Sequence, residues 1–183
     1  MKKVCILAFV FALCLGLPGC FGPTTISNVS SASTNRSESS EPEKNTAGMG
    51  QCVTGDKWAI SLLSAKTYTE IADEYYTDTP EEGKVFLVLF LEVENVSAED
   101  DYFNWLNFES YVDGYNQAQK MLMNKPDGVD TLTGDVAAGK KLKGHLAWEV
   151  SPEWSELEVS YKDSLWTGNK AATFKVTPAD ITE

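Results

Sequence analysis

The stretch VFLVLFLEVE, residues 85–94, is continuously apolar as far as Leu91 and then alternates between acidic and apolar residues. A strand has a continuous apolar run when neighbouring layers cover both of its faces. We therefore predict that these residues form a central strand of a sheet, covered on both sides.

A second stretch, KLKGHLAWEV at residues 141–150, has the period of two that is typical of a strand with one face in the core and the other in water. Its apolar face consists of Leu142, Gly144, Leu146, Trp148 and Val150. His145, the only histidine, falls on the opposite face with Lys141 and Lys143. We expect His145 to be exposed and to belong to no triad or zinc site, because both need converging partners.

Shorter stretches predict further strands and turns. Alternation indicates an opening strand near residues 58–62, a later strand at 157–161 and a closing strand at 174–176. Residues 112–115, Val-Asp-Gly-Tyr, are typical of a hairpin with a two-residue loop. About seven short strands separated by turns predict an all-β protein, an immunoglobulin-like antiparallel β-sandwich. Residues 68–76 and 100–108 could each hold a helical turn.

Charge narrows the classes of partner. The chain has 183 residues and a formal net charge of -12 at pH 7. Residues 51–183, the expected sandwich domain, hold 11 Lys and Arg against 24 Asp and Glu, so the acidity belongs to the domain. A surface of this sign repels phosphate backbones, and we expect no nucleic-acid partner.

Residues 1–19 resemble the signal peptide of bacterial lipoprotein precursors. A basic start precedes an apolar run at residues 4–17, which is too short to span a bilayer and ends in Leu17-Pro18-Gly19-Cys20. In such precursors the cysteine is acylated and the signal peptide is cut just before it. The resemblance implies that Cys20 anchors the protein to the extracytoplasmic face of a bacterial cell membrane. An ordinary secretory signal or an uncleaved anchor is the alternative.

Residues 20–50 have the composition of a tether. Eleven of residues 22–50 are Ser or Thr, without apolar periodicity. Such a segment buries too little apolar surface to offset its ordering entropy, so we predict a disordered tether between Cys20 and the domain.

Two blocks of the domain resemble a family of bacterial lipoproteins. In the first, Pro80-Glu81-Glu82-Gly83-Lys84 leads into the apolar strand that ends in Val93-Glu94-Asn95. In the second, Ala138-Gly139-Lys140 precedes a strand that ends in Trp148-Glu149-Val150-Ser151-Pro152. The chain resembles the uncharacterised immunoglobulin-like lipoprotein family, whose fold is similar to that of the mycobacterial secreted immunoprotective antigen. The resemblance covers roughly residues 52–178. It implies a fold but no particular activity.

Loop aromatics are the candidates for a partner-binding patch. They are Tyr102, Phe103, Trp105 and Trp154, which follow an acidic turn or a proline. Aromatic residues in loops of a rigid sandwich often anchor a protein interface. Covering the open end of the core is the alternative role.

Acidic residues are weak candidates for a calcium site. Five of them fall within ten residues: Asp73, Glu74, Asp78, Glu81 and Glu82. Carboxylates suit calcium, but their spacing matches no calcium loop, so we predict no metal site and interpret the run as a solvated loop. Cys52, the only thiol of the expected domain, has no partner for an intrachain disulfide and no adjacent base. We expect a buried or simply tolerated thiol, with an intermolecular disulfide as the alternative.

These observations predict a non-catalytic binding module, anchored by lipid at the bacterial envelope. The sequence contains no P-loop and no Gly-x-Ser-x-Gly elbow. We expect no enzyme and no cofactor, and the expected partners are the membrane, through Cys20, and an envelope protein. A calcium or small-ligand sensor that uses residues 68–82, or a spacer without any ligand, is the alternative.

Overall fold

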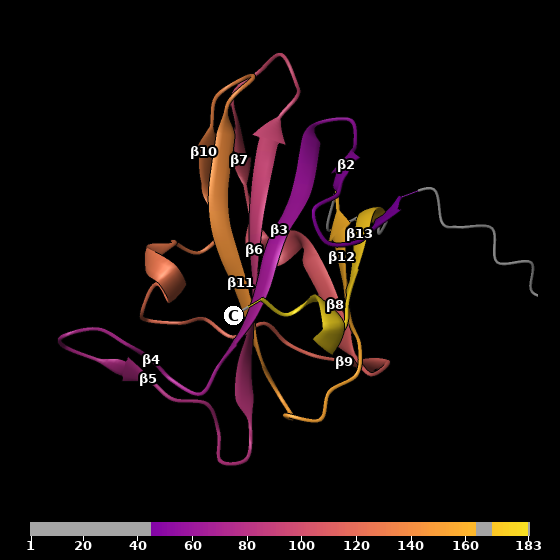
Figure 1. Cartoon of the computed structure of the whole chain (residues 1–183). Coiled ribbons are helices and arrows are strands. Elements are labelled where there is room, and N and C mark those ends of the chain that lie inside the picture. The colour runs from indigo at the N-terminus through magenta and orange to yellow at the C-terminus, as the bar shows by residue number, and fades with distance from the viewer. Residues whose placement is uncertain (1–44, 164–169, 183) are drawn as a thin grey trace, which may run out of the picture. The chain divides into compact units, whose positions relative to one another are not determined.

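The computed structural model describes residues 45–163 and 170–182, which form two main β-sheets and two short ribbons (Figure 1). The four-stranded sheet has the order β11 (Lys141–Val150), β6 (Val85–Asn95), β3 (Trp58–Tyr68) and β2 (Cys52–Thr54). The five-stranded sheet has the order β1 (Thr46–Ala47), β13 (Lys170–Val176), β12 (Leu157–Lys162), β8 (Phe108–Val112) and β9 (Tyr115–Asn116).

The ribbons and the short helices lie in the connections. One ribbon pairs β7 (Asp101–Phe103) with β10 (Gly134–Val136), and the other pairs β4 (Ile71–Ala72) with β5 (Thr77–Asp78). Three 3₁₀ helices are η1 (Trp105–Asn107), η2 (Pro126–Gly128) and η3 (Pro178–Asp180). All paired strands are antiparallel except β1 and β13.

The two main sheets enclose one hydrophobic core. Leu89 and Leu91 of β6 and Trp148 of β11 share this core with Phe174 of β13, on the opposite sheet. The indole Nε1 of Trp148 donates to the Ser110 hydroxyl of β8 at 2.8 Å, which joins the sheets by a buried hydrogen bond. The predicted antiparallel β-sandwich is confirmed.

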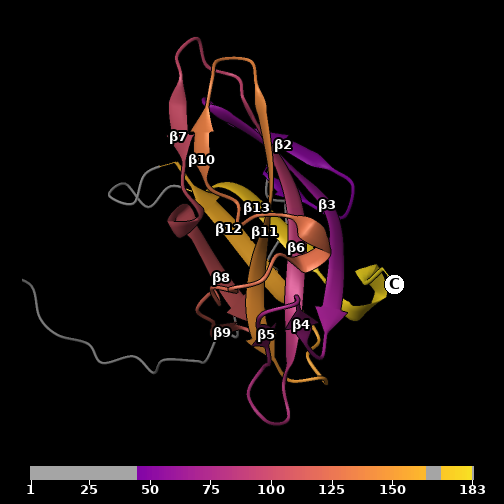
Figure 2. The same ribbon diagram turned by 90° about the vertical axis from the view of Figure 1, so that its left-hand side faces the viewer.

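The outer face of β6 is buried too, as the sequence predicts. Phe86, Val88 and Phe90 form a second hydrophobic cluster with Ile71 and Leu122. Ile71 lies in β4, and Leu122 lies in the segment that connects β9 to η2. These connections therefore cover the four-stranded sheet, and they lie in front of β6 in Figure 2.

The prediction that one face of β11 is wet is wrong for most of the strand. Residues 144–150 are all buried, and only Lys141 and Lys143 are exposed. His145 is 2% exposed, and its Nδ1 lies 2.9 Å from the Val129 carbonyl oxygen. Alternation assigned this face to water, but the segment that contains Val129 covers it. Burial lowers the pKa of His145, which is therefore held neutral.

The sandwich begins before residue 51. Thr46 and Ala47 pair with Thr173 and Phe174 of β13, and Ala47 is buried in the core. Composition had assigned these two residues to the predicted tether. Residues 1–44, which hold the predicted signal peptide and Cys20, lie outside the residues that the structure describes.

The Asp113-Gly114 hairpin is confirmed. Val112 of β8 pairs with Tyr115 of β9, and φ is 52° at Asp113 and 80° at Gly114. Both values are positive, as a two-residue hairpin loop of this type requires. Of the two segments left open, residues 100–108 contain the helical turn η1, whereas residues 68–76 contain β4 and the loop that leads to β5.

Gly144 lies where the covering segment comes closest to β11. A Cβ atom at this position would lie 2.7 Å from the main-chain nitrogen of Leu132 and closer still to its Cα. Leu132 is fully buried, and its N–H donates to the His145 carbonyl at 3.0 Å, so the segment is held against β11. The close approach therefore requires glycine.

We predict that Gly144→Ala lowers the free energy of unfolding by about 3 kcal/mol, because the added methyl overlaps buried backbone. Urea denaturation of wild type and variant measures the difference. Gly48→Ala is the matched control: nothing lies within 4 Å of its added Cβ, so we expect a change below about 1 kcal/mol. Equal stability of Gly144→Ala and wild type would contradict the packing described here.

Candidate functional site

Two of the four predicted partner-binding aromatics are core residues. Phe103 is 0% exposed, stacks on Tyr161 with ring centroids 5.3 Å apart, and meets the edge of Trp58 at 5.0 Å. Trp154 is 5% exposed and also belongs to the core. The prediction that Phe103 and Trp154 are surface anchors is wrong, because their rings fill the space between the sheets instead of facing solvent.

The other two aromatics do not complete a patch either. Trp105 of η1 is partly buried and packs against the core. Tyr102 of β7 is 53% exposed, and its hydroxyl lies 3.0 Å from the Thr133 hydroxyl. Of the predicted patch, Tyr102 alone presents most of its ring to solvent.

The acidic candidates at residues 68–82 organise the loop itself. The Asp73 carboxylate accepts the N–H groups of Tyr75 and Tyr76 at 2.7 and 2.8 Å, and these bonds lower the pKa of Asp73. Glu81 forms an ion pair with Lys84 at 2.6 Å. Within the part of the chain that the structure describes, no three His, Cys, Asp or Glu side chains come close enough together to hold a metal ion.

The same segment displays a set of exposed apolar side chains that the sequence analysis missed. Residues 71–78, which include β4 and β5, lie against residues 121–124, and we call these two segments the hairpin platform. Four large side chains of the platform face solvent, with exposed fractions of 86% for Tyr75, 54% for Tyr76, 64% for Met121 and 75% for Met123. These exposed side chains lie on two segments that hydrogen-bond to each other, which makes the platform a candidate interaction surface.

A buried polar clamp joins the two segments of the platform. The Asp78 carboxylate accepts the main-chain N–H groups of Met123 at 3.0 Å and Asn124 at 2.7 Å. The Asn124 amide in turn donates to the carbonyls of Ile71 at 2.8 Å and Tyr76 at 3.1 Å. Asp78 and Asn124 are only 8% and 6% exposed, so these bonds are shielded from water and hold the platform in one conformation.

The hydrophobic residues beneath the clamp fix the platform to the sandwich. Ile71 and Leu122 are 7% and 6% exposed and pack on the outer face of β6. Figure 1 shows the β4–β5 ribbon projecting beyond the two main sheets. The platform is therefore an exposed surface with a buried base.

Sequence signals for the platform exist in retrospect. Met121-Leu122-Met123 alternates as a strand would, with the middle residue buried and its neighbours exposed. Tyr75 and Tyr76 lie among acidic residues, and a run of this composition suggests metal binding more readily than a pair of exposed tyrosines. No local pattern indicates that Asn124 bonds a segment so distant in the sequence.

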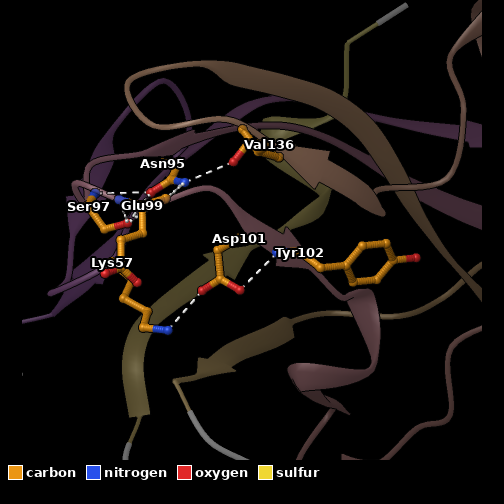
Figure 3. A network of polar contacts seen from close by, with 7 residues as sticks. All are labelled: Lys57, Asn95, Ser97, Glu99, Asp101, Tyr102 and Val136. Carbon is orange, nitrogen blue, oxygen red and sulfur yellow. Dashed lines mark hydrogen bonds and ion pairs between the residues drawn. The ribbon is translucent and has the colours of Figure 1, made fainter.

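A second polar network lies at the opposite end of β6 (Figure 3). The side-chain amide of Asn95 donates to the carbonyls of Glu99 and Val136 at 2.8 Å each, and its oxygen accepts the N–H and the hydroxyl of Ser97. Asn95 is 0% exposed and all its bonds are internal. The structure thus explains the Asn at the end of this strand, because its amide joins β6 to β10.

Beside this network, Lys57 and Asp101 form an ion pair at 2.8 Å (Figure 3). The Asp101 carboxylate also accepts the N–H of Tyr102 at 2.8 Å. The ammonium and this N–H lower the pKa of Asp101, so the carboxylate stays ionised. The pair orients the start of β7 and leaves neither charge unpartnered.

Cys52 and the small crevice beside β11 are two further features near the sandwich surface. Cys52 lies in the edge strand β2 and is exposed, so the thiol is not buried. The crevice has a cavity volume of about 10 Å³, room for about one water molecule, and is lined in part by Trp105, Met121 and Thr131. This volume is below the roughly 300–1,000 Å³ of a site for a drug-sized ligand.

Comparisons with known proteins agree with this fold. The family described as "Domain of unknown function (DUF4352)" matches residues 47–172. A Bacillus subtilis protein described as a "putative lipoprotein (ycdA)" has a TM-score of 0.54 and 16% sequence identity, over 70% of this chain and 39% of that one. The chain thus spans well under half the length of this neighbour.

Two further solved structures are similar over most of their own length. The yjhA protein from Bacillus subtilis has a TM-score of 0.52 and 13% identity, over 71% of this chain and 97% of that one. A conserved hypothetical protein from Bacillus anthracis has a TM-score of 0.52 and 13% identity, over 67% and 91% of the two chains. At these identities the similarity concerns the fold alone. No curated protein matches the chain.

We predict that Asp78→Ala lowers the free energy of unfolding by about 2 kcal/mol, because it leaves buried N–H groups without an acceptor. Hydrogen exchange at the Met123 and Asn124 amides should become faster in the variant. Glu82→Ala, which removes an exposed carboxylate of the neighbouring loop, should change stability by less than about 0.5 kcal/mol. Unchanged exchange at both amides would show that the clamp does not hold the platform.

Proposed function

We propose that this chain, which belongs to the family described as a domain of unknown function (DUF4352), is a lipid-anchored bacterial envelope protein whose β-sandwich binds another protein without catalysing a reaction. The observation that carries the proposal is the hairpin platform, where Tyr75, Tyr76, Met121 and Met123 are exposed above a buried clamp. The similarity to the fold of the mycobacterial antigen stays a prediction.

The platform has the properties of a preformed binding surface. Binding is weakened by the entropic cost of ordering mobile side chains and loops, and this cost is smaller for a surface that is already ordered. Asp78 and Asn124 fix the main chain of the platform before any partner arrives. Tyrosine offers a rigid ring with a polar tip, and methionine adapts its shape to different neighbours.

The chemistry of the remaining groups favours a binding role. His145 is the only histidine, and it is buried with its Nδ1 at the Val129 carbonyl, so it is not placed to act as a general base on a bound substrate. The pKa values of Asp101, Glu92 and Glu109 are lowered, in each case chiefly by a lysine partner. These are ion pairs at the surface, where they orient strands.

The proposed anchor rests on the sequence. Cys20 follows a signal-like segment, and one structural neighbour carries a lipoprotein description. Among residues 45–163 and 170–182, no helix has the length and apolar character needed to cross a bilayer. Two acyl chains on Cys20 would suffice to hold the protein at the membrane, since each buried CH₂ contributes about 0.8 kcal/mol.

We predict that Cys20→Ser abolishes the labelling of the protein with radioactive palmitate and leaves a precursor of higher mass, because the signal peptide with the apolar run of residues 4–17 is no longer cut off. Labelling and electrophoresis of cells that express the full chain measure both effects. Cys52→Ser is the matched control and should behave as wild type. A labelled Cys20→Ser protein would contradict the proposed anchor.

We also predict that a photo-reactive group on the platform captures a partner in intact cells. In the full chain, Tyr75→p-benzoylphenylalanine should give a crosslinked adduct of discrete mass after irradiation. The same group at Tyr115 of β9, which is 79% exposed outside the platform, should give none. Failure to crosslink from Tyr75, Tyr76, Met121 and Met123 in turn would refute the binding role of the platform.

A further inference from the structure

The hairpin platform combines its apolar side chains with acidic groups that have no counter-ion. Glu70, Asp73 and Glu74 are exposed on or beside the β4–β5 ribbon. Among the residues that the structure describes, none of the three forms an ion pair, although the Asp73 carboxylate accepts two N–H groups of the ribbon. The ribbon therefore presents uncompensated negative charge beside Tyr75 and Tyr76.

The lysines around the platform are engaged elsewhere. Each pairs with a carboxylate that does not belong to the three above: Lys66 with Asp127 at 3.2 Å, Lys84 with Glu81 at 2.6 Å, Lys120 with Glu149 at 2.8 Å and Lys125 with Asp130 at 2.6 Å. The two charges within each pair neutralise each other, so none of these lysines balances the negative charge of the ribbon. The two surfaces that meet in a protein interface usually carry electrostatic potentials of opposite sign. A partner that binds this ribbon should therefore be positively charged.

We infer that the hairpin platform docks a basic segment of another protein, in which Lys or Arg side chains alternate with apolar ones. This inference rests on the proposed function and names the chemistry of its partner. The apolar residues of the segment would contact Met121 and Met123, and its cations would face Glu70, Asp73 and Glu74. Its cations can also lie over the rings of Tyr75 and Tyr76, which attract positive charge.

Charge argues against the other occupants of such a surface. A second copy of the chain would bring its own acidic ribbon and a net charge of -12. Nucleic acid and anionic lipid carry charge of the same sign as the platform, and like charges that face each other in an interface repel and weaken binding. A basic protein segment is the occupant whose charge and apolar content both match.

Binding of designed peptides to the chain from residue 20 onward with Cys20→Ser, which lacks both the acyl chains and the apolar run of residues 4–17, tests the inference. The probe is a fluorescent peptide of Lys-Leu-Ser repeats. A peptide of Gln-Leu-Ser repeats lacks its positive charge, and a peptide of Lys-Ser-Ser repeats lacks its apolar side chains. We expect the Lys-Leu-Ser peptide to bind about fivefold or more tightly than either control, and its affinity to fall as the salt concentration rises from about 0.05 to 0.3 M.

Matched variants distinguish docking at the platform from general attraction to an acidic protein. Glu70→Gln with Glu74→Gln should weaken binding of the Lys-Leu-Ser peptide about fivefold. Glu99→Gln with Glu153→Gln removes the same charge from exposed positions outside the platform and should change the affinity less than about twofold. Equal weakening by both double variants, or equal binding of the Gln-Leu-Ser and Lys-Leu-Ser peptides, would overturn the inference.

The two proposals fail in different ways. If Tyr75 crosslinks to a partner in cells but the Lys-Leu-Ser peptide does not bind, the platform is an interaction site whose partner is not basic. If the platform variants change binding to vesicles of anionic phosphatidylglycerol instead of binding to the peptide, the partner is a membrane, and the inference is wrong. Absence of any crosslink refutes the binding role itself.

Discussion

The burial of β6 on both faces is the constraint from which the rest of the structure follows. Leu87, Leu89 and Leu91 fill the space between the sheets, and Phe86, Val88 and Phe90 point the other way. Each large apolar side chain left in water would forgo about 1.5 to 3 kcal/mol. A sandwich covers only one face of each sheet, so the second face of β6 requires a further layer, which the loops provide.

The platform is a consequence of that further layer. A segment laid over a sheet buries one side and turns the other to solvent. Leu122 therefore points down to Phe86 and Phe90, while Met121 and Met123 point outward. The clamp from Asp78 to Asn124 completes the layer by satisfying main-chain groups that burial removes from water. The residues that stabilise the fold thus also position the exposed ones.

The sequence predicts this fold where the pattern is local and misses it where distant segments meet. Alternation and the Asp113-Gly114 turn identify the main strands and one hairpin. The same alternation placed His145 in water, because it assumes that the outer face of a strand is wet. Phe103 and Trp154 were assigned to loops by their neighbours, yet their rings enter the core. The contact of Gly144 with Leu132, and the clamp across the platform, depend on tertiary packing that no local pattern records.

The acidity of the domain bears on how an anchored protein would present the platform. The cytoplasmic membrane of bacteria carries anionic lipid. A domain with 24 Asp and Glu against 11 Lys and Arg is repelled from such a surface within about a Debye length, roughly 8 Å at physiological salt. If Cys20 holds the chain to that membrane, repulsion keeps the ribbon of Glu70, Asp73 and Glu74 from lying against lipid. The charge that would select a basic partner would then also keep the surface for that partner free.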